Sequence, residues 1–140
     1  RTIRETKVEY GDFQTPLELA TRVCQKLIEL GVSPDVIVEP TCGVGNFIDA
    51  ATDLFQVTNK IIGVEINPNY LKAIRIKQKF LQDGRIEIKQ GNFFQLDWLS
   101  LLNSLEGKIL VLGNFPWITN SKQGTIGGVN LPTKNNFQKN

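Results

Sequence analysis

Residues 36–47 of the chain read VIVEPTCGVGNF, and this stretch decides the fold class that we expect. Three β-branched residues, Val36, Ile37 and Val38, predict a short buried strand. An acidic residue and a proline then lead into a turn with two glycines, and apolar residues recur at helical spacing from Phe47 onward. A strand that runs through a glycine-rich turn into a helix is typical of α/β domains that bind ligands.

The alternation of strand and helix continues along the chain. Apolar residues 61–64 predict a second buried strand, and Asn67 with Pro68 predicts the start of a helix that runs to Gly84. We expect an apolar face opposite a basic one on this helix, formed by Ala73, Ile76 and Phe80 and by Lys72, Arg75 and Lys79. Residues 85–89 alternate as in a partly covered strand, and the uninterrupted apolar residues 109–112 predict a central strand.

A helix is also expected before the first strand. Thr15 is placed as its N-cap and Pro16 as its first helical residue. Glu18 would complete a capping box, and Gly31 would end the helix. The full order is then a helix, three strand–helix units and a last strand. This order predicts an α/β domain with a parallel sheet and right-handed crossovers.

The composition excludes several classes of catalytic site. Of the 140 residues, 41% are hydrophobic and 21% are charged, as in an ordinary globular domain. There is no histidine, which excludes a Ser-His-Asp triad, a Cys-His pair and a histidine metal site, and we expect no metal. Cys24 and Cys42 lack the spacing of a zinc site, and we expect them to be small apolar fillers in a cytoplasmic protein.

The bulk properties indicate neither a membrane nor a nucleic acid as partner. No apolar run in the sequence approaches the length of a membrane span, so we expect no membrane partner. The net charge of +2 is too small to indicate nucleic-acid binding by itself. A DNA-binding function therefore has to be argued from the site.

Acidic residues end the first two strands, close to the glycine turn. Glu39 stands where open parallel sheets bind ligands, and Gly43 and Gly45 would let a ligand approach the backbone closely. An acid in this place suits a cationic ammonium group better than a phosphate. Glu65 follows Gly45 by about 20 residues, the spacing at which an acid of this fold meets a ribose. A purely structural turn and an exposed glutamate are the alternative interpretations.

Two segments that combine an amide with aromatic residues follow the third and the last strands. Residues 91–94, GNFF, offer an amide for the edge of a nucleobase and a ring for its face. Residues 112–117, LGNFPW, end a strand with an amide, a proline-stiffened turn and a tryptophan. Structural roles are equally open: a polar loop with core phenylalanines in the first segment, and a turn-capping Asn114 with a core Trp117 in the second.

Together these segments resemble the S-adenosylmethionine-dependent methyltransferases that modify the N6 amino group of adenine in DNA. The resemblance extends from Gly11 to about Gln138. Residues 11–16, GDFQTP, are similar to the N-terminal cofactor motif of that family, and residues 39–47 to its acid-Pro-x-Cys-Gly-x-Gly-x-Phe signature. Residues 63–67, GVEIN, resemble its ribose strand, and residues 114–117, NFPW, resemble its Asn-Pro-Pro-aromatic catalytic motif. The implied fold is a Rossmann-like class I methyltransferase domain, here with an N-terminal helix and the first four strands.

The resemblance also implies roles for individual residues. Those expected to bind S-adenosylmethionine are Phe13, Thr15, Glu39, Pro40, Cys42, Gly43, Gly45, Glu65, Ile66, Asn92 and Phe93. Those expected to form the target-base pocket and to act in catalysis are Asn114, Phe115, Pro116 and Trp117. Within the first group, the ribose is assigned to Glu65 and the adenine ring of the cofactor to Ile66, Asn92 and Phe93.

Two positions depart from the family pattern. Asn92 stands where the family usually has aspartate, although an amide oxygen can still accept a hydrogen bond from an adenine amino group. Phe115 replaces the first proline of the catalytic motif. The group needed there is a backbone carbonyl, which any residue supplies, but the turn loses some rigidity.

The activity implied is transfer of a methyl group to the N6 atom of a flipped-out adenine in DNA, in a restriction-modification system. The alternatives are methylation of RNA adenine N6, cytosine N4 or protein glutamine N5, and a non-catalytic subunit that binds cofactor or DNA. Methylation of cytosine C5 is disfavoured, because neither Cys24 nor Cys42 lies after the fourth strand, where that reaction needs a nucleophile.

We expect the chain, which begins Arg1-Thr2-Ile3, to be part of a longer protein. Residues 1–120 would form the N-terminal part of the catalytic domain, and residues 121–140 a loop or flexible tail after the catalytic motif. The region that recognises the DNA sequence would then be largely absent, and the chain alone would not methylate specifically. With only four strands, the last strand would present an open apolar edge.

Overall fold

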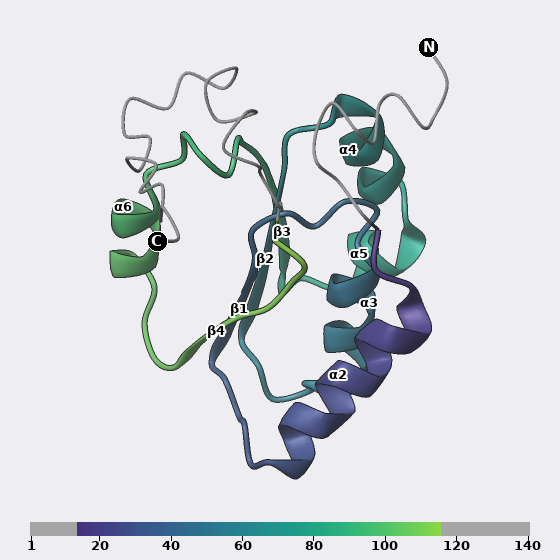
Figure 1. Ribbon diagram of the computed structural model, residues 1–140, viewed down its shortest axis with the longest axis vertical. Helices are drawn as coiled ribbons and strands as arrows, with labels where there is room; N and C mark the ends of the chain where they lie inside the picture. Colours follow the sequence, from purple (N-terminus) through teal and green to yellow (C-terminus); the bar gives the residue numbers. More distant parts are fainter. Residues whose placement is uncertain (1–13, 116–140) are drawn as a thin grey trace, which may run out of the picture.

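The computed structural model describes residues 14–115, which form one sheet with helices on both faces (Figure 1). The strands are β1 (Val36–Glu39), β2 (Lys60–Glu65), β3 (Ile86–Gln90) and β4 (Ile109–Val111). The helices are α2 (Leu17–Glu29), α3 (Asn46–Leu54), α4 (Pro68–Arg75), α5 (Gln78–Gln82) and α6 (Trp98–Asn103). This is the predicted order, with α4 and α5 together in the place of the second crossover helix.

All paired strands of the sheet are parallel, in the order β3-β2-β1-β4. Val36 at the start of β1 pairs with Lys60 on one side and Ile109 on the other. The predicted α/β fold with a parallel sheet is therefore confirmed. The chain adds β2 and β3 on one side of β1 and then crosses to place β4 on the other side. The strand order thus reverses between β1 and β4, and open sheets of this kind bind ligands at such a point.

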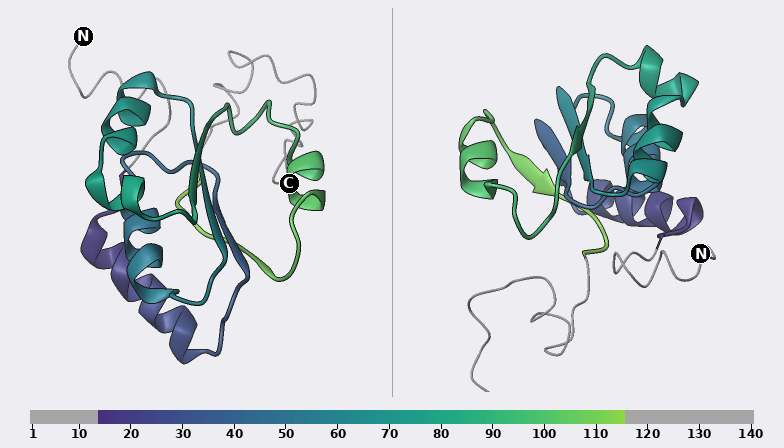
Figure 2. Two further views of the ribbon diagram at one scale, coloured as in Figure 1. Left: turned by 180° about the vertical axis from the view of Figure 1, so that it is seen from behind. Right: turned by 90° about the horizontal axis from the view of Figure 1, so that it is seen from above.

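Successive residues of the strands face two separate hydrophobic cores. Ile37 and Ile61 belong to the core on the side of α2 and α3. Val38 and Ile62 belong to the opposite core, against which Trp98 of α6 packs. Figure 2 shows the same division, with α6 alone on one face of the sheet and the other helices across from it. All four residues of β1 are buried, because this strand is covered on both faces and paired on both edges.

Arg85 holds the carboxyl end of α3, the helix that begins at the glycine turn. Its guanidinium donates to the carbonyl oxygens of Thr52 at 3.0 Å and Phe55 at 2.8 Å. Asp83 accepts a 2.8 Å hydrogen bond from the same group. This hydrogen bond from Arg85 holds the pKa of the Asp83 carboxyl below its ordinary value. A paired cation is favourable at this end of a helix, where carbonyl groups lack helical partners.

The predicted start of the first helix is wrong. Pro16 is the N-cap of α2, the helix begins at Leu17, and no side chain caps it. The carbonyl oxygen of Thr15 accepts a hydrogen bond from the Asn46 side chain at 2.8 Å, so this segment is fixed by α3 instead. Glu18 pairs with Arg22 at 2.9 Å and forms no capping box. At the other end, Gly31 follows the helix in a left-handed conformation, as predicted.

The single helix predicted up to Gly84 is also wrong, because it breaks into α4 and α5. Asn67 caps α4 as predicted, through a hydrogen bond from the backbone N–H of Asn69 to its side chain. The chain is extended at Lys77, between the two helices. Ile76, expected on the apolar face, is 75% exposed. Phe80 is buried as predicted, and Leu71 and Ile74 are buried in addition, because the break changes which residues face the core.

The prediction of a central strand at residues 109–112 is wrong for the described residues. β4 ends at Val111 and lies at an edge of the sheet, beside β1 only. Val111 is 45% exposed, while Leu112 is buried just beyond the strand. An unbroken apolar run predicts a strand that is covered on both faces. It does not show whether a second strand pairs with each of its edges. Within the part of the chain that the structure describes, no strand pairs with the outer edge of β4, as expected for four strands.

The two cysteines are both buried thiols. Burial raises the pKa of the Cys24 thiol to about 11, which suppresses the reactive thiolate and agrees with a role as an apolar filler. Within residues 14–115, no helix is both long and apolar enough to cross a membrane. Over the same residues, the acidic and cysteine side chains form no group of three that could hold a metal ion.

Candidate functional site

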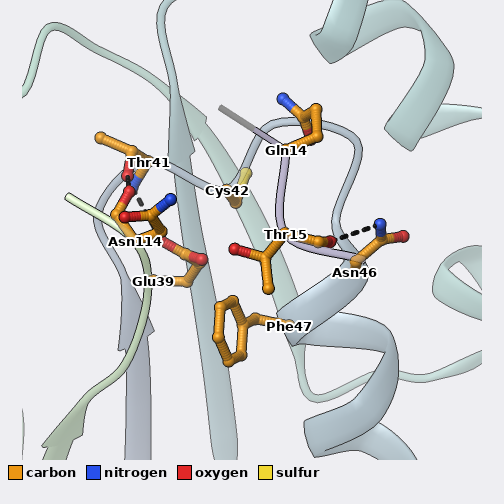
Figure 3. A pocket seen from close by; sticks show the side chains of 8 residues that line it. All are labelled: Gln14, Thr15, Glu39, Thr41, Cys42, Asn46, Phe47 and Asn114. Carbon is orange, nitrogen blue, oxygen red and sulfur yellow. Dashed lines mark hydrogen bonds between the residues drawn. The ribbon is translucent and has the colours of Figure 1, made fainter. Parts of the chain in front are cut away.

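A pocket lies at the carboxyl ends of β1 and β4, where the strand order reverses. Figure 3 shows the residues that line it, which are Gln14, Thr15, Glu39, Thr41, Cys42, Asn46, Phe47 and Asn114. They come from the segment before α2, from the stretch that runs from the end of β1 through the glycine turn into α3, and from the loop after β4. Three segments far apart in the sequence therefore meet at the position that the fold favours for a ligand.

The glycine turn after β1 is fastened to the end of β2. The backbone N–H of Cys42 donates to the carbonyl of Val64 at 2.8 Å. The backbone N–H of Gly43 donates to one carboxylate oxygen of Glu65 at 3.0 Å, and the other oxygen accepts from Asn67 at 3.1 Å. Glu65 is only 5% exposed, so these are buried bonds to a charged group, which are among the stronger ones in proteins. The predicted contact between Glu65 and a ribose stays a prediction.

The second glycine of the turn packs directly against α4 and α5. Gly45 is the N-cap of α3 and has a φ of 87°, in the left-handed region. A Cβ atom at this position would lie 2.7 Å from Ile74 and 2.8 Å from Phe80, closer than such atoms can approach. The ammonium of Lys77 donates to the carbonyl of Val44 from the same side. Only glycine therefore fits at position 45, for reasons of both conformation and space.

The segment before α2 crosses over the glycine turn. The backbone N–H of Val44 donates to the side-chain oxygen of Gln14 at 3.1 Å. The side chain of Asn46 donates to the carbonyl of Thr15 at 2.8 Å, which Figure 3 shows as a dashed line. Thr15 is thus placed in the pocket with the glycine turn. Phe13, predicted beside it, lies outside the described residues.

Glu39 carries a buried carboxylate at the end of β1. It is 3% exposed, and one of its oxygens accepts a hydrogen bond from the backbone N–H of Thr41 at 3.0 Å. Pro40 beside it is buried as well. The loop after β4 runs close by, because a Cβ on Gly113 would lie only 2.2 Å from a carboxylate oxygen of Glu39. A glycine at position 113 is what lets the two strand ends approach each other.

Asn114 of the predicted catalytic motif lies beside this turn. The Thr41 hydroxyl donates to the backbone carbonyl of Asn114 at 3.1 Å, and Figure 3 shows the Asn114 side chain near those of Thr41 and Glu39. Asn114 and Phe115 are both exposed. The structure thus brings the two predicted parts of the site, for cofactor and for catalysis, to one edge of the sheet. Pro116 and Trp117 lie outside the described residues.

The predicted adenine-binding residues stand outside this pocket, in the loops after β2 and β3. Ile66 is half-buried directly after β2. The side-chain oxygen of Asn92 accepts a hydrogen bond from the backbone N–H of Phe94 at 3.0 Å, so it shapes its own turn. The Phe93 ring lies against the rings of Trp98 and Phe115, with centroids 5.7 Å and 6.0 Å away. Their contact with a cofactor stays a prediction.

The chemistry of the lining favours a cationic ligand over an anionic one. Among residues 14–115, those that line the pocket provide the carboxylate of Glu39 together with amide and hydroxyl groups, and none of them is a lysine or an arginine. A phosphate would meet a buried negative charge here, whereas an ammonium or sulfonium group would be attracted to it. S-adenosylmethionine carries both of these cationic groups, so the residues present fit the predicted cofactor.

Three contacts of the glycine turn involve residues that we did not predict for the site. Gln14 stands between Phe13 and Thr15 within the quoted N-terminal motif, so its position there was an available signal. Asn46 lies within the quoted motif of residues 39–47, so its position was also an available signal. No motif in the sequence pointed to Lys77, which lies in a stretch predicted to be one helix with a basic face. Its contact with the glycine turn depends on the break between α4 and α5.

Comparison with known proteins agrees with this fold, although no protein-family model matches the chain. Over 136 residues, or 97% of its length, the chain is 60% identical to type II methyltransferase M.NspV of Nostoc sp., covering 28% of that protein. The chain is homologous to part of a type II methyltransferase. A second relative, type II methyltransferase M.CvrRI of Paramecium bursaria Chlorella virus XZ-6E, is 31% identical over 85% of the chain and 27% of the relative. The chain therefore spans about a quarter of the length of these curated relatives.

Solved structures confirm the Rossmann-like methyltransferase fold. PH1948 from Pyrococcus horikoshii, described as an RNA methyltransferase, matches with a TM-score of 0.63 at 17% identity, over 87% of the chain and 59% of the other protein. SAM-bound CalS10 from Micromonospora echinaspora, an amino pentose methyltransferase, matches with a TM-score of 0.53 at 15% identity, over 87% and 47%. At these identities the likeness concerns the fold. Together with the M.NspV homology, it supports S-adenosylmethionine as the cofactor.

Proposed function

We propose that this chain is the cofactor-binding part of an enzyme that methylates the N6 amino group of adenine in DNA, within a restriction-modification system. The observation that carries the proposal is the position of Asn114 beside the acidic glycine turn, at the reversal of the strand order. The homology to M.NspV supports methyl transfer and a type II system. The choice of adenine N6 rests on the resemblance of residues 114–117 to the catalytic motif.

The residues of the glycine turn would hold the cofactor. S-adenosylmethionine supplies a methyl group on a positively charged sulfonium, which is already electrophilic. Glu39 would attract the ammonium end, since its carboxylate is buried at the edge of the pocket. Gly43 would allow close approach to the backbone, Gly45 would hold the turn in place through its packing on Ile74 and Phe80, and Glu65 would accept from the ribose hydroxyl groups.

Asn114 and Phe115 would act on the amino group of the target base. The lone pair of adenine N6 is delocalised into the ring, which makes it a poor nucleophile. The side-chain oxygen of Asn114 and the backbone carbonyl of Phe115 can each accept one N6 hydrogen. Two such acceptors draw the nitrogen towards a tetrahedral shape and stabilise the positive charge that develops on it. Holding the nitrogen in line with the methyl group contributes further to the rate.

The target base has to leave the duplex to reach this pocket, since its amino group is otherwise paired and stacked. Trp117, in the position of the aromatic residue of the motif, would stack on the flipped base. DNA is accordingly the proposed partner, and most of its contacts would come from regions outside this chain.

A product assay on the full-length protein tests the choice of substrate. Unmethylated DNA, RNA and a glutamine-containing protein fraction would each be incubated with S-adenosylmethionine labelled in its methyl group. We expect label in N6-methyladenine of DNA, and only there. Label in N4-methylcytosine, in RNA or in protein would contradict the proposed substrate, and cofactor binding without any transfer would indicate a non-catalytic subunit.

Replacement of Asn114 tests the assigned role of its side chain. We expect Asn114→Ala to lower the rate of methyl transfer by at least a hundredfold, because one of two preorganised acceptors is lost. The affinity for S-adenosylmethionine, measured by calorimetric titration, should stay within about twofold, since a contact made only in the transition state does not contribute to ground-state binding.

The matched control for this variant is Asn103→Ala, which removes an exposed amide at the end of α6, away from the pocket. This variant should keep both properties. Equal losses of transfer and of cofactor binding in Asn114→Ala would contradict the catalytic role.

A further inference from the structure

Phe115 is the residue at which the catalytic motif of this chain departs from the family pattern, and its ring has a defined neighbour. It stacks on the ring of Phe93, with centroids 6.0 Å apart and ring planes 23° apart. This geometry lies within the range of favourable aromatic pairs. Phe93 belongs to the loop after β3 and Phe115 to the loop after β4, the two edge strands of the sheet. The stack therefore joins loops from opposite edges.

Phe93 is itself firmly placed, so that it can serve as a support. The indole N–H of Trp98 donates to the Phe93 carbonyl at 2.7 Å, and the two rings are in contact. Trp98 in turn packs into the core formed by residues of β1 and β2. The core thus fixes Trp98, and Trp98 fixes Phe93. Phe93 in turn supports the exposed ring of Phe115.

Phe115 is adjacent to Asn114 in the chain, and each of the two residues contacts a neighbouring loop. The Asn114 carbonyl accepts from the Thr41 hydroxyl on one side, and the Phe115 ring lies on Phe93 on the other. A proline would stiffen the backbone of this loop from within, by fixing one torsion angle. Phenylalanine leaves that torsion angle free, and its ring instead ties the loop to a neighbouring one.

We propose that the side chain of Phe115 is a positioning residue, whose stacking on Phe93 replaces the missing proline in holding Asn114 towards the target base. This proposal rests on the proposed function. It adds to that function a role for the Phe115 ring that is distinct from the role of the Phe115 backbone carbonyl. Phe115 acts through Asn114, so its loss should slow the chemical step and leave cofactor binding in place.

Phe94 provides a matched control. Like Phe115, it is an exposed phenylalanine in contact with Phe93, at a centroid distance of 5.1 Å. It is 48% exposed and Phe115 is 42% exposed. Phe94 follows Phe93 in the same loop, however, so its contact does not join that loop to Asn114. Replacement of either residue removes a similar apolar contact, and only Phe115→Leu releases the catalytic loop.

The test compares Phe115→Leu, Phe115→Tyr and Phe94→Leu in the full-length protein, since every variant retains the backbone carbonyl at position 115. We expect Phe115→Leu to lower kcat by roughly threefold to tenfold, the range that corresponds to one aromatic pair. Phe115→Tyr should keep wild-type turnover, because a tyrosine ring can stack on Phe93 in the same way. Phe94→Leu should leave kcat unchanged. The Kd for S-adenosylmethionine and the melting temperature should be the same in all three variants.

Two results would overturn this inference while leaving the proposed function intact. The first is a kcat of Phe115→Leu equal to that of Phe94→Leu and the wild type. The second is a weaker Kd for S-adenosylmethionine in Phe115→Leu at unchanged kcat, which would make the ring a wall of the cofactor site. Failure of the proposed function itself is distinguishable, because the wild-type protein would then form no N6-methyladenine.

Discussion

The two loops that meet in the candidate site are held in very different ways. The glycine turn between β1 and α3 is tied to its surroundings by Glu65, Gln14 and Lys77, and its two glycines are buried. At the end of the loop after β4, Asn114 and Phe115 are exposed, and the contacts of these two residues include a hydrogen bond from Thr41 and a ring contact with Phe93. The glycine turn is part of the folded core, whereas Asn114 and Phe115 of the loop lie at the surface. We therefore expect changes in the turn to affect stability, and changes in the loop to affect mainly turnover.

The largest effect should come from adding a methyl group to the glycine turn. Gly45→Ala should lower the free energy of unfolding by about 3 kcal/mol, because left-handed backbone and overlap with Ile74 and Phe80 both cost energy. Gly31→Ala is the control, since Gly31 has a similar φ of 82° with nothing within 4 Å of the added atom. It should cost only about 1 kcal/mol.

Urea denaturation of the full-length protein measures both values. Equal losses in the two variants would mean that the turn tolerates a side chain, and the contrast between turn and loop would then be smaller than we infer.

An intermediate effect is expected at the far end of the helix that follows the glycine turn. Asp83→Asn should cost roughly 1 to 2 kcal/mol at pH 7, because Arg85 loses a charged acceptor and its hold on α3 weakens. The pKa of the Asp83 carboxyl is lowered from an ordinary value of 3.8, so its stabilising contribution is present above that pH. It is lost as the pH falls through the depressed value in the folded protein.

The difference in stability between wild type and Asp83→Asn should therefore shrink as the pH falls below about 3.8. Denaturation curves at pH 7 and at several acidic values measure this change. A difference that is independent of pH would contradict the assigned role of the Asp83–Arg85 pair. Cofactor affinity should fall in parallel with stability if α3 helps to place the glycine turn.

The smallest effect should come from the loop after β4. Thr41→Val removes the hydroxyl that donates to the Asn114 carbonyl, and the bond is exposed. We expect turnover to fall about twofold to threefold, with the free energy of unfolding changed by less than about 0.5 kcal/mol. The control is Thr21→Val, because the Thr21 hydroxyl also donates to a carbonyl, that of Leu17 within α2. If Thr41→Val lowered stability and left turnover unchanged, the loop after β4 would behave as we expect of the glycine turn, and the inferred contrast would be wrong.

Local patterns in the sequence were sufficient for the order of strands and helices and for the places of several candidate site residues at strand ends. Apolar, β-branched runs followed by an acid predict strand ends at Glu39 and Glu65, and both residues lie there in the structure. The carboxyl ends of parallel strands share one edge, so these residues had to come close together. The motif at residues 114–117 could be placed after a strand for the same reason.

The tertiary structure decided what depends on contacts between distant segments. Thr15 is not an N-cap because Asn46, from another helix, binds its carbonyl. The second crossover helix breaks at Lys77 because the glycine turn takes up that side chain and packs on Phe80. The stacking of Phe115 on Phe93 joins the loops after the two outermost strands, a contact that the strand order alone does not predict. A sequence records the propensity of each segment, but the partner that overrides it becomes known only when the chain is folded.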